Sequence, residues 1–362
     1  MPDQSIYSAL SRRSLFLALA VPLAAEPVKL PRKIRVAIVG LEGHTGEIMD
    51  PLPNLPDVEI VAVSDADPAS VKRFIRSHAA LAKARPYADY RSMLDAETLD
   101  LVAVCNNNGE RAAAVLACID RKLHVIAEKP LSINRPDLER IRAAVSRQGV
   151  NLGMLLPMRY EPHYRALRDL VRAGVLGEVA QISAQKSYKT GERETWYTRR
   201  ETYGSTILWI GTHMIDLMRF TSGREFTHVS SFMGRVGFPE LGAMENTTVS
   251  AFRLDNSGAA TLHMDYYRPE TAGTHGDDRL RLAGTEGVAE YMAATGLTLM
   301  SKRSKPAVID KLPPSGSVFV DFLEHVYMGK PASLPLEDIY RVCELALAAS
   351  EAALAGKVVR TA

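Results

Sequence analysis

Short apolar runs alternate with amphipathic segments between residue 33 and about residue 155. The strand-like runs are IRVAIV (34–39), EIVAVS (59–64), LDLVAVC (99–105), LHVIAEKP (123–130) and NLGMLL (151–156). A nearly all-apolar run such as 99–105 is typical of a strand that is buried on both faces. Strands that alternate with helices through short turns predict a parallel sheet.

Capping residues mark helix boundaries in the same part of the chain. Asp67 is placed to cap a helix that has Pro68 at its first position. Asn134 is placed to cap a helix over 135–148, and Gly149 is placed to end it. These residue types are favoured there because Asp and Asn accept hydrogen bonds from the first amides, whereas Gly tolerates a left-handed backbone.

The pattern changes after Pro157. Helices are expected over about 162–173 and 205–221, and an Ala/Leu-rich helix ends the chain. The strand-like runs are VAQISAQKSY, FTHVSSFMG, NTTVSAFRL, GAATLHMDYY, DRLRLAG and GVAEYM. In GAATLHMDYY, one face is apolar and the other is polar; the apolar face is formed by Ala260, Leu262, Met264 and Tyr266. This period of two predicts a mostly antiparallel sheet that is covered on one side.

The turn after the first strand is rich in glycine. It reads VGLEGHTG, with Gly40, Gly43 and Gly46, and Asp65 ends the second strand 25 residues after Gly40. Glycines let the backbone approach a pyrophosphate, a helix N-terminus favours its charge, and an acidic residue at this spacing meets ribose hydroxyls. The layout predicts a Rossmann nucleotide-binding fold. Residue 66 is Ala rather than Arg, which favours NAD, with NADP possible.

The glycine spacing departs from G-x-G-x-x-G because Glu42 stands at the usual second-glycine position. Either the loop is one residue longer and Gly43 takes that role, or a carboxylate faces the phosphates, which is unfavourable. His44 and Thr45 lie in the same loop and are further candidates for cofactor binding.

Length and composition indicate a two-domain α/β protein. The chain has 362 residues, 46% of them hydrophobic, and a net charge of +2, which gives no indication of a nucleic-acid partner. Three distant cysteines and scattered histidines form no metal or disulfide pattern, so the cysteines are expected to be packed thiols. We predict a Rossmann doubly wound parallel sheet in 31–156, a substrate and oligomerisation domain in 157–335, and a C-terminal helix in 336–362 that packs back on the core.

Residues 1–30 form a separate segment. Arg12 and Arg13 precede an apolar run, 15–25, that is too short to span a bilayer. The segment resembles a twin-arginine export signal, and the alternatives are an uncleaved anchor or a disordered tail. Because twin-arginine substrates are exported folded, we expect a periplasmic protein with a tightly held, recycled cofactor and no stable membrane insertion after cleavage. Without export, the protein would be cytoplasmic.

Beyond the signal, the chain resembles the Gfo/Idh/MocA oxidoreductases. The segments that carry the resemblance are the glycine loop, Asp65, KLHVIAEKP, MRYEPHYRALRDLVRAGVLGEV, YGSTILWIGTHMIDLMRF and LRLAGTEGVAEY. The resemblance implies a Rossmann domain followed by an α/β domain with a large open sheet, which commonly forms the interface of a homodimer or homotetramer. It also implies oxidation or reduction of sugars, polyols and related carbohydrates with NAD(P).

Lys129 matches the lysine of the family's EKP motif. It follows a parallel strand at the carboxyl edge, where ligands bind in open α/β sheets, and an ammonium there favours deprotonation of a reacting hydroxyl. Glu128 would hold Lys129 or touch the nicotinamide. The alternative is a surface Lys-Pro pair after a strand.

His213 matches the histidine of the second family motif and is the candidate acid/base. The alternative is a structural histidine bonded to Asp216. Many members carry an aspartate four residues earlier, where this chain has Trp209, which cannot move a proton at neutral pH. The Trp209 ring would pack against a sugar or belong to the core.

A second departure lies in CNNNGER (105–111), where the family usually has a Thr-Pro-Asn-like turn and then histidine. Asn106, Asn107 and Asn108 are candidates for the nicotinamide ribose or carboxamide. Arg111 stands at the histidine position, where it would pair with an anion or lie exposed.

Other polar residues are candidates for substrate binding. Arg159 and His163 lie where family members often place substrate-side or interdomain residues. Below them rank Tyr188 and Lys189, and His275, Asp277 and Asp278 in the loop THGDDR, because polar loops of this kind are usually solvated. The sequence thus predicts an NAD(P)-dependent oxidoreductase that acts on a secondary hydroxyl of a carbohydrate. Two alternatives remain open: a redox-neutral glycoside hydrolase or lyase that works through a transient keto-sugar, and a non-catalytic NAD-bound sugar-binding or sensor protein.

Overall fold

The N-terminal half forms a six-stranded parallel sheet. The computed structural model of the protein describes residues 27–361. The strands are β1 (Ile34–Val39), β2 (Val58–Ser64), β3 (Arg85–Tyr87), β4 (Leu101–Val104), β5 (His124–Ala127) and β6 (Leu152–Met154). Their order is β3-β2-β1-β4-β5-β6, the order of a doubly wound Rossmann sheet. The predicted fold of this half is therefore confirmed.

Helices flank this sheet, and two of them begin at the predicted caps Asp67 and Asn134. They are α1 (Gly46–Met49), α2 (Pro68–Ser77), α3 (Tyr90–Ala96), α4 (Asn108–Asp120) and α5 (Arg135–Gln148). Asp67 accepts hydrogen bonds from the amides of Ala69 and Ser70, and Gly149 ends α5 with a φ of 65°. By contrast, α1, the helix that follows the glycine loop, has only four residues.

The C-terminal half forms a nine-stranded sheet that is mostly antiparallel. Its strands are β7 (Val179–Lys189), β8 (Phe226–Gly234), β9 (Thr247–Leu254), β10 (Ala259–Arg268), β11 (Gly276–Gly284), β12 (Gly287–Met292), β13 (Gly296–Ser301), β14 (Ser304–Val308) and β15 (Val359–Arg360). The order is β14-β13-β12-β11-β7-β10-β9-β8-β15, and only β7 and β10 pair in parallel. The predicted apolar face of β10 is buried, from Ala260 to Tyr266.

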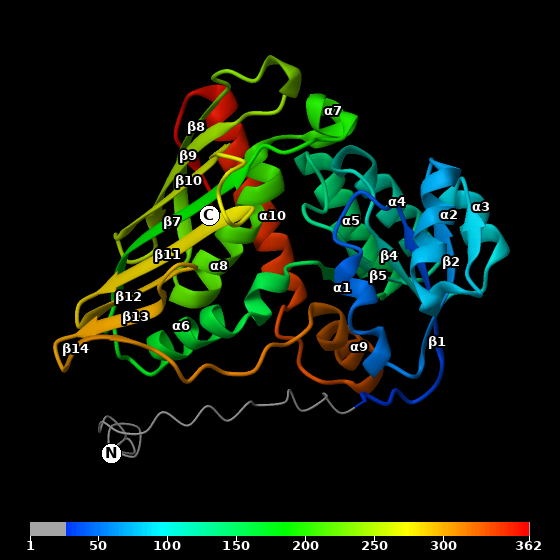
Figure 1. Cartoon of the computed structure of the whole chain (residues 1–362), viewed down its shortest axis with the longest axis horizontal. Helices are drawn as coiled ribbons and strands as arrows, with labels where there is room; N and C mark the ends of the chain where they lie inside the picture. Colours follow the sequence, from blue (N-terminus) through cyan, green and yellow to red (C-terminus); the bar gives the residue numbers. More distant parts are fainter. Residues whose placement is uncertain (1–26, 362) are drawn as a thin grey trace.

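Three helices lie on the side of this sheet that faces the Rossmann domain (Figure 1). They are α6 (Pro162–Arg172), α8 (Thr212–Ser222) and α10 (Leu336–Ala355). The C-terminal helix α10 contacts β8 and α8 in the second half and also α5 in the first. It therefore ties the two halves together.

The predicted domain boundaries need one correction. Helix α9 (Val318–Met328) was assigned to the substrate domain, but its apolar residues pack into the core of the Rossmann sheet. Gly153 of β6 lies directly against the Phe322 ring, where an added Cβ would come within 2.7 Å. The chain therefore returns to its first core after the second sheet is complete, so residues 157–335 do not form one continuous domain.

The described part of the chain has three further global features. Cys105, Cys118 and Cys343 are all free and buried, as predicted for packed thiols. None of the described helices combines the length and apolarity needed to cross a bilayer. Between residues 27 and 361, no group of three or more His, Cys, Asp or Glu side chains is arranged to hold a metal ion. The export signal predicted from Arg12 and Arg13 lies outside the described residues.

Candidate active site

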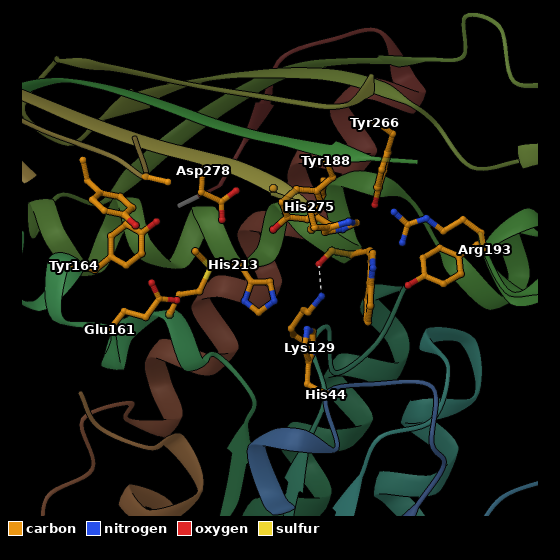
Figure 2. Close-up of a pocket in the computed structure, with 17 residues that line it drawn as sticks. His44, Lys129, Glu161, Tyr164, Tyr188, Arg193, His213, Tyr266, His275 and Asp278 are labelled. Carbon is orange, nitrogen blue, oxygen red and sulfur yellow. Dashed lines mark hydrogen bonds between the residues drawn. The ribbon is translucent and has the colours of Figure 1, made fainter. Parts of the chain in front are cut away.

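A cavity of about 410 Å³ opens where the carboxyl end of β5 meets the helices of the second half. Its lining residues come from both halves of the chain: His44, Lys129, Met158, Glu161, Tyr164, Tyr188, Arg193, Tyr197, Trp209, Ile210, His213, Tyr266, His275, Gly276, Asp278, Tyr291 and Ala293. Figure 2 shows Lys129, His213 and His275 in the middle of this group, with Glu161 and Arg193 on opposite sides.

Lys129 is held at the base of the cavity with only 1% of its surface exposed. Its Nζ donates a hydrogen bond of 2.8 Å to the Trp209 carbonyl and lies 3.2 Å from the centroid of the Trp209 ring. Burial lowers the pKa of Lys129 to about 7, and the charges of Arg111 and Lys186 add to this effect against the opposing charge of Glu128. The amine can therefore exchange a proton near neutral pH. The reading of Lys129 as a surface lysine is wrong.

Trp209 lies in a π-helical segment, Ile207–Gly211, that runs directly into α8. Such segments are rare and occur frequently at functional sites because they break the regular spacing of side chains. Here Trp209 presents both its carbonyl and its ring to Lys129. Its ring also lies edge-on to Trp196 and Tyr197, at centroid distances of 5.4 and 6.1 Å. Trp209 is thus part of an aromatic wall that lines the cavity.

His213 stands in the first turn of α8 and faces the same cavity. Its Nδ1 is buried and has no hydrogen-bond partner among the described residues. Burial and the nearby charges of Lys129, Lys186 and His44 hold the pKa of His213 well below 6.5, so the ring is neutral. Asp216 bonds Arg159 instead, so the alternative of a His213–Asp216 pair is wrong.

Glu128 connects the glycine loop to the end of β5. The fully buried carboxylate accepts hydrogen bonds from the amides of His44 and Lys129, at 3.0 and 2.6 Å, and also contacts the His44 ring. Burial favours the neutral acid, but the charges of His44 and Lys129 outweigh it and lower the pKa of Glu128 to about 2. Glu128 therefore stays ionised and fixes the position of His44.

Two of the predicted glycines are required by close packing. Gly40 has a φ of +78°, and a Cβ on it would come within 2.3 Å of the Asn106 backbone. A Cβ on Gly43 would come within 2.4 Å of the Glu128 side chain. The loop therefore lies directly against the ends of β4 and β5. Thr45 and Gly46 lie where α1 begins, and Gly46 has no comparable crowding.

A second cavity, of about 850 Å³, lies beside this loop and includes Asp65, the residue predicted to meet ribose hydroxyls. It is lined by Leu41, Glu42, Asp65, Ala66, Asp67, Ser70, Arg73, Phe74, Ser77, Glu194, Thr195 and Trp196. Asp65 accepts a hydrogen bond of 3.0 Å from the Leu41 amide. Glu42 faces this cavity, and its burial together with the charge of Asp65 raises its pKa, which favours the neutral acid. Glu42 lines this cavity, whereas Gly43 packs against Glu128, so both alternatives for the loop stay open.

The three asparagines have different environments. Asn106 has a buried Oδ1 without a partner in the described part of the chain, so it can accept a hydrogen bond from a bound nucleotide. Asn107 caps α4 by accepting from the Glu110 amide, and Asn108 donates to the Tyr203 carbonyl. Asn106 alone therefore offers an unused acceptor, and the other two have structural partners.

Both expectations for Arg111, that it pairs with an anion or lies exposed, are wrong. It is neither exposed nor paired with an anion, but fully buried. Its guanidinium donates to Asn108 Oδ1 and to the Pro130 carbonyl, at 2.8 and 2.9 Å, and to the Asn106 carbonyl. Arg111 thus joins the turns that follow β4 and β5, which are the turns that carry Asn106 and Lys129.

The candidate substrate residues divide into two groups. Tyr188, Trp209, His213, His275 and Asp278 line the cavity. The others are engaged elsewhere: Arg159 bonds Asp216 and Asp338, Lys189 donates to the Glu270 carbonyl, Asp277 pairs with Arg279, and His163 stacks on Tyr291. The ion pairs of Arg159 favour a structural role for this residue.

Sequence reasoning missed several lining residues. Burial raises the pKa of Glu161 to about 7, although Lys186 opposes this, and Glu161 has no side-chain hydrogen bond in the described structure. Arg193 and Tyr197 lie in the segment TGERETWYTRR, where no periodicity separates them from solvated neighbours. The only available signal for Glu161 was its place before Pro162 at a helix start, which marks many ordinary helices.

Known proteins share both halves of this fold. Residues 34–155 match the oxidoreductase family model with an NAD-binding Rossmann fold, and residues 164–290 match the model of the Gfo/Idh/MocA C-terminal domain. An oxidoreductase structure from Thermotoga maritima is 30% identical, with a TM-score of 0.85 over 90% of this chain and 100% of that chain. Fold and site define an NAD-binding oxidoreductase. The chain belongs to the Gfo/Idh/MocA family.

Two further relatives have named activities. Myo-inositol 2-dehydrogenase from Thermotoga maritima is 24% identical over 255 residues, which cover 70% of this chain and 74% of that protein. A levoglucosan dehydrogenase in complex with NADH has a TM-score of 0.79 at 17% identity, over 91% of this chain and 100% of that chain, and so shares the fold.

Proposed function

We propose that the protein is an NAD-dependent dehydrogenase that oxidises a secondary hydroxyl of a sugar, polyol or related carbohydrate. The observation that carries this proposal is the placement of Lys129 and His213. Both face one cavity at the carboxyl edge of the Rossmann sheet, and both are buried in a way that favours their proton-accepting forms. The inositol and levoglucosan dehydrogenases among its relatives act on polyhydroxylated substrates of this kind.

The chain's own residues account for the proton and for binding of the nucleotide. NAD, when bound, supplies the hydride acceptor. The glycine loop and Asp65 would hold the nucleotide, with Asn106 as a free acceptor beside it. Lys129 orients the substrate hydroxyl and takes up its proton as the carbonyl forms, and neutral His213 offers a second acceptor in the same cavity. The buried position of Lys129 excludes water from this step.

The lining of the nucleotide cavity favours NAD over NADP. Glu42, Asp65, Asp67 and Glu194 contribute four carboxyl groups, whereas Arg73 is the one basic side chain among the lining residues. A 2′-phosphate would meet net negative charge there. We further propose that the twin-arginine-like segment exports the folded protein with its nucleotide retained, which requires the cofactor to be reduced and reoxidised within the protein.

The first experiment identifies the bound nucleotide. The protein is purified without added cofactor, denatured, and the released molecules are identified by mass spectrometry. Stoichiometric NAD(H) supports the proposal, and an empty protein that binds NAD only weakly would contradict cofactor retention. Product analysis with a sugar panel follows: net oxidation supports a dehydrogenase, whereas release of an aglycone without net redox change would favour the hydrolase or lyase alternative.

A further inference from the structure

Arg193 is a cation of the substrate cavity without an acidic partner. It lines the cavity from the segment between β7 and α7 (Arg200–Tyr203), and no carboxylate lies within ion-pair distance of it among residues 27–361. Its guanidinium donates a hydrogen bond of 2.9 Å to the Lys189 carbonyl. Its Nε is buried and unpartnered. A partly buried charge without an acidic partner costs free energy unless a ligand supplies the missing negative charge or hydrogen-bond acceptor.

Two tyrosine rings pack against the guanidinium of Arg193. The Arg193 Cζ lies 5.2 Å from the centroid of the Tyr197 ring and 4.9 Å from that of the Tyr266 ring. Both rings also line the cavity. Stacking of this kind preorganises the flat, forked donor set that binds a carboxylate through two parallel hydrogen bonds. Figure 2 shows Arg193 reaching into the cavity from the side opposite Glu161 and Tyr164.

An aromatic surface connects this cation to the reactive lysine. The Lys129 ammonium lies over the Trp209 ring, the Trp209 ring contacts Tyr197 edge-on, and Arg193 lies over Tyr197. A sugar bound beside this aromatic wall would therefore share one cavity with both Lys129 and Arg193. A hydroxyl on the ring and an acidic group attached to it would meet these two residues at the same time.

We propose that Arg193 is a specificity-determining residue and that the substrate is a carbohydrate with one carboxylate, such as a uronic or aldonic acid. The proposal rests on the function proposed above. A carboxylate is favoured over a phosphate because Glu161 and Asp278 also line the cavity, and they would repel a dianion more strongly than a single negative charge.

The test compares acidic and neutral sugars of the same configuration. NADH formation and calorimetric binding are measured for D-glucuronate, D-galacturonate, D-mannuronate and D-gluconate, for the matching neutral sugars, and for glucose 6-phosphate. At least one acid is expected to be bound and oxidised in preference to its neutral counterpart. Arg193→Met should lower kcat/KM for that acid by about 10- to 100-fold because a charge-assisted pair is lost, and leave the neutral sugar nearly unchanged.

Two further variants separate specificity from structure. Arg193→Lys keeps the positive charge but not the paired donors of the guanidinium, so an intermediate loss of kcat/KM is expected for the acidic sugar. Arg199→Met is the control, because Arg199 is exposed in the same segment and does not line the cavity. Equal loss for acidic and neutral sugars in Arg193→Met, or preference for neutral sugars or for glucose 6-phosphate in the unmodified protein, would overturn the proposal. Binding of an acid that depends on Arg193, with no oxidation of any sugar, would uphold this inference and reject the dehydrogenase.

Discussion

At the scale of single residues, the site depends on a lysine that is buried beside other charges. Lys129 has Glu128 next to it in the chain, but Glu128 is directed to His44 and to the backbone rather than to the lysine ammonium. The ammonium is instead held by a neutral carbonyl and an aromatic ring. These partners orient Lys129 without stabilising its charge as strongly as a carboxylate would, which leaves its proton available for chemistry.

Replacement of Lys129 by methionine tests this role. Lys129→Met keeps the shape of the buried stem and removes the amine, so kcat is expected to fall about 100- to 1,000-fold, as when a single preorganised donor is lost. The melting temperature should not fall, because a buried charge is removed. Steady-state kinetics and thermal unfolding measure the two effects. Lys189→Met is the control, since the Lys189 amine donates to the Glu270 carbonyl outside the cavity; an equal loss in both variants would argue against Lys129.

The pH dependence of the reaction follows from the pKa of Lys129. Oxidation needs the neutral amine, so kcat/KM should rise with pH and level off above an inflection near 7. Glu161 also has a pKa of about 7, whereas neutral His213 does not titrate in this range. The inflection should therefore persist in Glu161→Gln. Its disappearance in that variant would assign the titration to Glu161.

The lowered pKa of Lys129 also affects the free energy of unfolding. The pKa of Lys129 is about 7 in the folded protein and about 10.5 when the chain is unfolded, so the unfolded state binds more protons between these values. The contribution of Lys129 to the free energy of unfolding should thus increase as pH rises from about 7 to 10.5, and denaturant unfolding of Lys129→Met should lack this increase.

At the scale of helices and strands, the elements with strong apolar patterns were predictable. Strand β1 was predicted with its observed bounds, because a strand buried on both faces leaves a continuous apolar run. Strand β3 was missed because it has only three residues, two of them exposed. Helix α9 was missed although it is apolar, and its docking on the first core depends on contacts far apart in sequence.

Residues that line the candidate cavity were predictable where a family motif marks them, but the side-chain partners of those residues were not. Lys129 and His213 were found from their motifs, but the pairing of Asp216 with Arg159 instead of His213 was not. The regular helix expected over 205–221 contains a π-helical segment, which turns Trp209 toward Lys129. Hydrophobic periodicity cannot show such an insertion because all residues of the segment are buried.

Arg111 provides a prediction at this scale, because it holds two turns together. Arg111→Met would leave the carbonyls of Asn106 and Pro130 and the Asn108 amide oxygen without their donor inside the core. The free energy of unfolding is expected to fall by about 3 kcal/mol or more, at about 1–3 kcal/mol for each unpaired group. Urea unfolding measures this loss. Arg121→Met, at the exposed end of the same helix, should cost less than about 1 kcal/mol, and similar losses in both variants would contradict the assignment.

At the scale of the whole molecule, the second half of the chain lines the candidate nucleotide cavity as well as the candidate substrate cavity. The segment between β7 and α7 contributes Arg193 and Tyr197 to the substrate cavity and Glu194, Thr195 and Trp196 to the nucleotide cavity. One short segment thus lines both sites. A nucleotide bound in the second cavity would contact this segment, so we expect the segment to slow its release.

This arrangement predicts slow cofactor release that depends on Trp196. The Trp196 side chain is 93% buried by the fold and packs against Trp209, Tyr197 and Tyr203 while it lines the nucleotide cavity. Trp196→Ala is expected to increase the dissociation rate of NAD about tenfold, since lost aromatic contacts act mainly on dissociation. The rate is measured by dilution of the loaded protein into a nucleotide trap.

Phe232→Ala is the matched control for this measurement, because Phe232 is an exposed aromatic residue of β8 that lines neither cavity. Its NAD dissociation rate should equal that of the unmodified protein. If Trp196→Ala keeps its melting temperature and releases NAD at the same rate as Phe232→Ala, the segment does not retain the nucleotide. Any retention of the nucleotide would then have to come from the Rossmann half alone, where the glycine loop, Asp65 and Asn106 are the candidate contacts.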